Sequence, residues 1–133
     1  MEYLFVYGTL MRNYTNNPFR LLLEKNTNFI GEAFTYGKLF LVDYYPGLIH
    51  DLPSENHKVY GEIVSFESET DFLKSLDEYE DYDPENIINS LYIRELKECF
   101  LLVDNSSFIC HTYIYNQKVN NLKFLNKGRF FLS

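Results

Sequence analysis

The chain has 133 residues, enough for one domain whose hydrophobic core needs neither disulfides nor a metal. With 46% hydrophobic and 23% charged residues it has the composition of a globular protein, and twelve Tyr and twelve Phe make it rich in aromatic side chains. A net charge of −7 argues against nucleic acid or an anionic membrane surface as a partner.

The ends and the cysteines of the chain predict a cytoplasmic protein. No apolar run approaches the roughly 20 residues needed to span a bilayer. Met1 leads directly into a strand-like pattern, without the basic and apolar segments of a signal peptide. Cys99 and Cys110 are the only cysteines, and we expect both to be reduced thiols.

The first predicted element is a central strand over residues 2–7, because both of its faces are apolar. It belongs to the segment "LFVYGTL", in which the apolar run stops at Gly8 and a small hydroxyl residue, Thr9, follows. Either the turn must be tight, or a ligand must come close to the backbone, and glycine suits both.

The middle of the chain alternates between short predicted elements. Asn17 and Pro18 are typical of a helix start, and "FRLLLEK" continues as a short helix. The following segments are predicted as one or two strands over 28–42 with bends at Gly31 and Gly37, a turn at "YYPGLI" (44–49), a polar loop at 51–56 and a strand over 58–66.

A second helix is predicted from Ser68, which resembles a capping box with Asp71, through about Tyr79. At 100° per residue its apolar stripe consists of Phe72, Leu73, Leu76 and Tyr79.

Glu80 falls inside this stripe, Asp77 lies at its edge, and Glu78 lies on the opposite side. Two interpretations of Glu80 follow. The helix frays and the carboxylate meets water, or Glu80 lines a cavity where burial raises its pKa and suits it to general acid/base catalysis.

An acidic loop, "EDYDPENIIN", separates this helix from two further strands, about 91–103 and 107–116, which are joined by a turn at "DNSS". About six strands and two or three helices indicate the α+β class, as a single domain over residues 1–133 with a mixed, partly closed sheet or barrel.

Other candidate sites are weaker. The three histidines show no metal-ligand spacing, and the acidic run from Asp77 to Glu85 lacks the pattern of an EF-hand loop. Cys110 and His111 point to opposite faces of a strand and cannot form a nucleophile–base pair. Cys99 is best explained as a buried small hydrophobe, although a pair with His111 across the hairpin would give a thiol hydrolase.

Two of these pieces, "YGTL" and "LDEYE", lie about seventy residues apart and together resemble the gamma-glutamylcyclotransferase-like family, in which a Y-G-[ST]-L loop is followed by an L-D-x-x-E segment. Between and after them, "GKLFLVDYYPGL", "VYGEIVSF", "YIR" and "TYIY" resemble further family segments in the expected order. The resemblance covers residues 3 to 116. One departure is Asp81, because members of the family often carry glycine after the glutamate.

The resemblance implies the family's small α+β fold and a cyclotransferase that converts a small-molecule γ-glutamyl amide to 5-oxoproline and an amine or amino acid. Glu80 would be the catalytic acid/base. Tyr7, Gly8, Thr9 and Leu10 would bind substrate, Tyr7 as a wall and the others through backbone N–H groups. No metal or organic cofactor is implied.

Two questions about this site remain open in the sequence. The same cavity could bind a carboxylate-bearing metabolite without reacting, as a non-catalytic binding module. If Asp81, Asp83 and Glu85 line the cavity mouth, their field favours a γ-glutamylamine over a γ-glutamyl amino acid.

Overall fold

The computed structural model describes residues 1–8, 20–42, 45–51, 56–68 and 71–130. Within these residues the chain forms eight strands, two α-helices and a short 3-10 helix, which confirms the α+β class. In chain order they are β1 (Glu2–Val6), α1 (Arg20–Asn26), β2 (Thr27–Tyr36), β3 (Lys38–Val42), β4 (Tyr45–Ile49), β5 (Lys58–Phe66), α2 (Phe72–Tyr79), η1 (Ile87–Asn89), β6 (Tyr92–Leu101), β7 (Ser107–Tyr115) and β8 (Lys123–Phe124).

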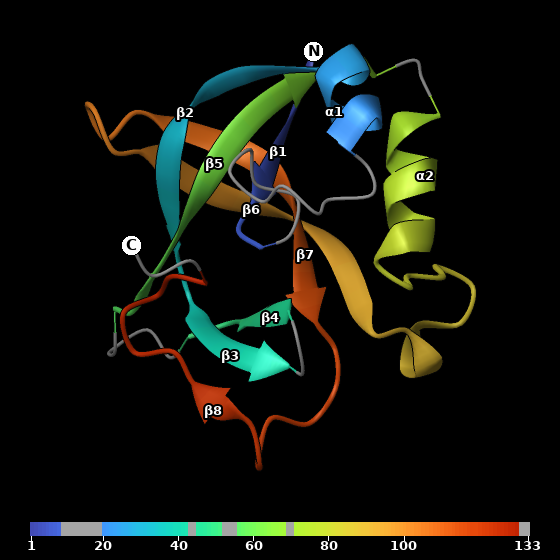
Figure 1. Ribbon diagram of the computed structural model, residues 1–133, viewed down its shortest axis with the longest axis vertical. Helices are drawn as coiled ribbons and strands as arrows, with labels where there is room; N and C mark the ends of the chain where they lie inside the picture. Colours follow the sequence, from blue (N-terminus) through green and yellow to red (C-terminus); the bar gives the residue numbers. More distant parts are fainter. Residues whose placement is uncertain (9–19, 43–44, 52–55, 69–70, 131–133) are drawn as a thin grey trace.

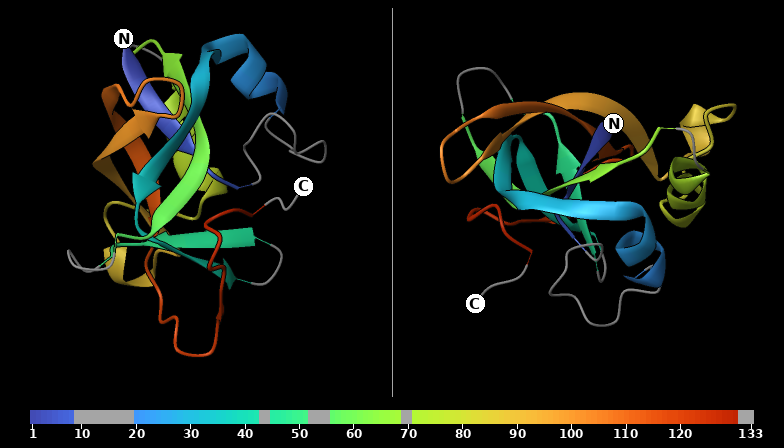
Figure 2. Two further views of the ribbon diagram at one scale, coloured as in Figure 1. Left: turned by 90° about the vertical axis from the view of Figure 1, so that its left-hand side faces the viewer. Right: turned by 90° about the horizontal axis from the view of Figure 1, so that it is seen from above.

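Five strands close into a barrel in the order β1-β5-β2-β6-β7 (Figure 1). Neighbouring strands are antiparallel except β1 and β7, which run parallel and close the barrel where Leu4 pairs with His111. The remaining strands form a second sheet, β4-β3-β8, at one end of the barrel (Figures 1 and 2). The predicted mixed sheet and barrel are therefore confirmed.

The strand count exceeds the predicted six, partly because the "YYPGLI" segment is not a turn. Residues 45–49 are strand β4, in which Pro46 lies opposite Leu41 of β3. The prediction was wrong because Pro-Gly is typical of turns, but β4 is an edge strand, where the missing N–H of proline is tolerated.

Successive side chains of β1 point alternately into two hydrophobic cores, as expected for a strand that is apolar on both faces. Phe5 belongs to the core inside the barrel, which also contains Ile63. Leu4 and Val6 belong to a second core, which includes Leu76 of α2. This outer core joins the helices to the outside of the barrel and fixes where α2 ends.

Helix α2 begins later than the sequence predicted. Asp71 is the N-cap and makes no side-chain cap hydrogen bond, so the predicted capping box is wrong. Ser68 instead hydrogen-bonds to Glu2 on β1. The predicted start of the first helix, at Asn17 and Pro18, lies outside the described residues, while the part from Arg20 is helical as predicted. None of the helices in the described ranges has the length and apolarity needed to cross a membrane.

The end of α2 is a Schellman motif. The N–H of Tyr82 donates to the carbonyl of Asp77 at 2.9 Å, and the N–H of Asp81 donates to the carbonyl of Glu78 at 3.2 Å. Asp81 has φ 55°, the left-handed position that glycine usually occupies in this motif. The glycine common in the resembling family therefore has a conformational reason, and this chain meets the same demand with aspartate.

Replacing Asp81 with glycine should stabilise the protein by about 0.5–1 kcal/mol, because glycine adopts positive φ without steric strain. The change also removes a carboxylate from a helix C-terminus, where it is unfavourable. Asp81→Ala is the matched control, since it removes the same charge and keeps the Cβ atom. Urea unfolding should show Asp81→Gly to be the more stable variant; equal stabilities would contradict the strain at this position.

Candidate active site

A cavity of about 290 Å³ opens where the end of β1, the end of α2 and the strands β4, β6 and β7 meet. Aromatic side chains dominate its wall, and Glu80 is the only carboxylic acid among the described residues that line it. The lining residues are Phe5, Val6, Tyr7, Gly8, Tyr45, Pro46, Tyr79, Glu80, Leu91, Tyr92 and Tyr113.

Glu80 is the C-cap of α2, and its N–H still donates to the carbonyl of Leu76 at 2.9 Å. The helix therefore does not fray before this residue, and the side chain keeps the direction of the apolar stripe into the cavity. Burial raises the pKa of Glu80 from 4.5, and the negative charge of Asp77 raises it further, to about 8. The carboxyl is mostly protonated at pH 7 and ionises just above neutrality.

Two cavity tyrosines, Tyr7 and Tyr92, are hydrogen-bonded through their hydroxyl groups to backbone groups of the protein. Tyr7 donates to the carbonyl of Tyr113 at 2.6 Å and accepts the N–H of Leu48 at 3.2 Å. Tyr92 donates to the carbonyl of Pro46 at 2.6 Å. Burial raises the pKa of both Tyr7 and Tyr92, so their hydroxyls stay neutral. These bonds fix the aromatic walls before any ligand enters.

Gly8 lies at the cavity wall directly after β1. A Cβ atom there would lie 2.8 Å from Cγ of Pro46, so glycine is required for contact with β4. The absence of a side chain also leaves the Gly8 backbone at the cavity surface. Contact with Pro46 is thus a reason for glycine that the sequence did not suggest, while the tight turn and the ligand near the backbone stay predictions. Thr9 and Leu10, the other predicted substrate-binding residues, lie outside the described residues.

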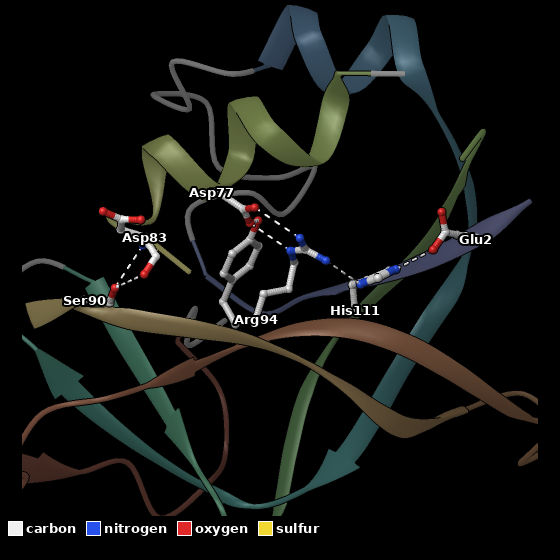
Figure 3. Close-up of polar contacts among 7 residues, drawn as sticks. Glu2, Asp77, Asp83, Ser90, Arg94 and His111 are labelled. Atoms are coloured by element: carbon white, nitrogen blue, oxygen red, sulfur yellow. Dashed lines mark hydrogen bonds and ion pairs between the residues drawn. The ribbon is translucent and has the colours of Figure 1, made fainter. Parts of the chain in front are cut away.

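Asp77 and Arg94 form an ion pair beside the cavity that the sequence analysis did not predict. Arg94 Nε donates to Asp77 Oδ1 at 2.8 Å and Arg94 Nη2 donates to Asp77 Oδ2 at 3.1 Å (Figure 3). Asp77 lies in "LDEYE" at the edge of the apolar stripe and Arg94 in "YIR", but neither signal pairs the two residues with each other. Arg94 is on a strand that follows in the chain, so helical spacing could not identify it as the partner of Asp77.

The thiol-hydrolase alternative is wrong. Cys99 is fully buried in the barrel core, as expected for a small hydrophobe, and pairs in register with Phe108. His111 lies opposite Leu96 instead, and its ring nitrogens contact Arg94 and Glu2. The two groups cannot act as nucleophile and base, because the barrel interior holds one and the outer face holds the other.

The acidic loop after Glu80 does not line the cavity. Asp81, Asp83 and Glu85 are exposed and absent from its wall. Asp83 makes its hydrogen bonds within the loop. Its N–H donates to Ser90 Oγ at 2.9 Å, and its carboxylate accepts the N–H of Glu85 at 2.9 Å. The predicted acidic rim is therefore wrong, and with it the stated reason for preferring a γ-glutamylamine. In the described ranges no three His, Cys, Asp or Glu side chains form a candidate metal site.

Comparisons with known proteins agree with this architecture. The family model "Gamma-glutamyl cyclotransferase, AIG2-like" matches residues 4–131. An AIG2-like protein from Mus musculus is similar in structure, with a TM-score of 0.71, 26% identity and coverage of 95% of this chain and 86% of that chain. The comparison with curated proteins gave no match.

Two further structures are similar in fold. PH0828 from Pyrococcus horikoshii has a TM-score of 0.62 at 19% identity, covering 98% of this chain and 90% of that chain. YkqA from Bacillus subtilis has a TM-score of 0.67 at 22% identity, covering 96% of this chain and 39% of that chain. At these identities the likeness concerns the fold alone.

Glu80→Gln should flatten the dependence of stability on pH. A carboxyl whose pKa rises from 4.5 to about 8 on folding stabilises the fold below its unfolded pKa, and this contribution is lost as pH rises through about 8. The parent protein should therefore lose on the order of 4 kcal/mol more than the variant between pH 5 and pH 9. Urea unfolding measures this, with Glu78→Gln on the exposed face of α2 as the control. Equal losses in parent and Glu80→Gln would contradict the raised pKa.

Tyr7→Phe should destabilise the protein by about 1–3 kcal/mol, because the carbonyl of Tyr113 and the N–H of Leu48 lose their shared partner in a buried site. Thermal or urea unfolding tests this. Tyr60→Phe, on a partly buried ring outside the cavity lining, is the comparison and should cost less. Similar costs would show that the Tyr7 hydroxyl has no special structural role.

Proposed function

The chain belongs to the gamma-glutamyl cyclotransferase, AIG2-like family, and we propose that it catalyses cyclotransfer on a γ-glutamyl amide, releasing 5-oxoproline and an amine or amino acid. The observation that carries the proposal is the position of Glu80. Its carboxyl is the only acid on the described wall of a cavity of about 290 Å³, whose lining also includes Gly8, two residues after β1.

The reaction is intramolecular. The α-nitrogen of the γ-glutamyl group attacks its own γ-carbonyl carbon, a C–N bond forms to close a five-membered lactam, and the original amide C–N bond breaks. Such a reaction needs orientation and proton transfer more than a protein nucleophile. A cavity with fixed aromatic walls and one carboxyl supplies these two requirements.

Glu80 acts as the proton carrier in this scheme. Its carboxylate accepts a proton from the α-ammonium, and the resulting carboxyl donates it to the leaving nitrogen. The second proton lost by the α-nitrogen also ends on the leaving amine, so the reaction consumes neither water nor an external proton. A pKa of about 8 places Glu80 near the operating pH, where both forms are accessible.

Binding of the glutamyl portion is assigned to the end of β1. In the proposed complex, backbone N–H groups of Gly8, Thr9 and Leu10 hold its polar groups and Tyr7 forms a wall. The support is that Tyr7 and Gly8 both line the cavity. The proposed partner is thus a small molecule in an aromatic cavity, with no cofactor assigned.

Glu80→Gln should lower kcat/KM by about 100-fold or more, because the amide cannot relay a proton. The measurement is the release of 5-oxoproline from a panel of γ-glutamyl amino acids and γ-glutamyl amines. Glu78→Gln is the matched control: it makes the same change two residues earlier on the exposed face of α2 and should keep parental activity.

The pH dependence gives a second readout. In the parent protein kcat/KM should rise with pH up to about 8, as Glu80 ionises. Parental activity in Glu80→Gln would refute the assigned mechanism. Thermal stabilisation by a substrate that yields no 5-oxoproline would instead favour the non-catalytic binding module.

A further inference from the structure

We infer that the Asp77–Arg94 ion pair is a positioning device for Glu80: it fastens the last turn of α2 to the barrel and, through its charge balance, sets the pH at which Glu80 ionises. The catalytic consequence rests on the proposed function. The ionisation of Glu80 is a property of the folded protein and can be tested without substrate.

Both oxygens of Asp77 are used in fastening the helix. Besides the two bonds from Arg94, Oδ1 accepts the hydroxyl of Tyr113 at 2.7 Å. Arg94 on β6 and Tyr113 on β7 are directly opposite each other in the strand register. One carboxylate is therefore held by two neighbouring strands, and the planar guanidinium fixes its orientation.

Asp77 also holds the chain on the far side of Glu80. Its backbone carbonyl accepts the N–H of Tyr82 in the Schellman motif at 2.9 Å. The side chain of Asp77 thus binds the barrel while its main chain binds the residue two positions after Glu80. The backbone of Glu80 lies between these two attachments and is held on both sides.

Arg94 is in turn held in place by His111, which is hydrogen-bonded to Glu2. Its Nη1 lies 3.0 Å from Nδ1 of His111, and Nε2 of His111 lies 2.7 Å from Glu2 Oε1 (Figure 3). Arginine only donates hydrogen bonds, so Nδ1 of His111 is the acceptor and Nε2 carries the proton that is donated to Glu2. The hydrogen bonds from His111 and Ser68 lower the pKa of Glu2, which keeps it ionised. The network therefore runs from α2 across β6 and β7 to β1.

The charges around Glu80 come from every element that packs against it. Burial raises the pKa of Tyr7, Tyr92 and Tyr113, so these hydroxyls stay neutral, and Asp77 is the group whose charge raises the pKa of Glu80. The groups are Asp77 from α2, Tyr7 from β1, Tyr45 from β4, Tyr92 from β6 and Tyr113 from β7, with Arg94, His111 and Glu2 behind Asp77.

Of the two members of the pair, Asp77 acts on Glu80 directly, and Arg94 is expected to act on it by balancing the charge of Asp77. Asp77 raises the pKa of Glu80. Burial lowers the pKa of Arg94, but hydrogen bonds to Asp77 and its charge outweigh burial and raise it, so Arg94 stays cationic. Arg94 offsets the negative charge of Asp77, and each residue is therefore expected to shift Glu80 with its own sign.

The test is a titration of the Glu80 carboxyl by ¹³C NMR in protein labelled at glutamate, with the signal assigned by its loss in Glu80→Gln. In Asp77→Asn the midpoint should fall, because the negative charge that raises the pKa of Glu80 is removed. In Arg94→Gln the midpoint should rise, because Asp77 is left without its counter-ion. Glu78→Gln, on the exposed face of the same helix, should leave it unchanged.

Arg94→Lys separates position from charge. Lysine keeps the positive charge but cannot make the pair of hydrogen bonds that the planar guanidinium of Arg94 makes to Asp77. The midpoint should stay close to the parent value, while kcat for 5-oxoproline release should fall at little changed KM, because Glu80 is less firmly placed.

Opposite shifts in Asp77→Asn and Arg94→Gln support the inference; no shift, or shifts of the same sign, overturn it. Should Asp77→Asn fail to fold, the direction of the shift in Arg94→Gln decides alone. Since the titration needs no turnover, a protein that shows these shifts but makes no 5-oxoproline refutes the proposed function and leaves the positioning device intact.

Discussion

The docking of α2 on the outer face of the barrel is the constraint on which the site depends. The apolar stripe of the helix packs into the outer core through Phe72 and Leu76. Because Glu80 continues this stripe by one turn, burial of the stripe carries a carboxyl to the edge of the same core. Burial of the apolar side chains thus offsets the free-energy cost of placing a carboxyl in an apolar environment. This environment raises the pKa of the carboxyl.

The closed barrel supplies the other half of the site. β1 has an inner and an outer apolar face and lies between β5 and β7, so its end is fixed on both sides. Gly8 follows directly, where contact with Pro46 of β4 excludes a side chain. Two segments far apart in sequence, the end of β1 and the end of α2, are brought to one cavity by this packing.

Tyr7, Tyr92 and Asp77 are held in place by hydrogen bonds within the fold. Tyr7 links β4 to β7, Tyr92 binds β4, and Asp77 binds β6 and β7. Within the described residues no buried side-chain nitrogen or oxygen lacks a partner. Such preorganisation means that a ligand would not have to order the walls of the cavity, which reduces the entropic cost of binding.

The sequence by itself determined the class of the fold, most of the elements and the direction of Glu80. These are local properties: a run that is apolar on both faces marks β1, alternation marks β5, the 3.6-residue period marks α2, and the same period aims Glu80 along the apolar stripe. Tertiary structure decided what local patterns do not encode. Pro46 and Gly47 form an edge strand and not a turn, since pairing with β3 overrides the turn preference. Asp77 and Arg94 meet because α2 lies across β6, a contact set by packing between elements and not by spacing along the chain.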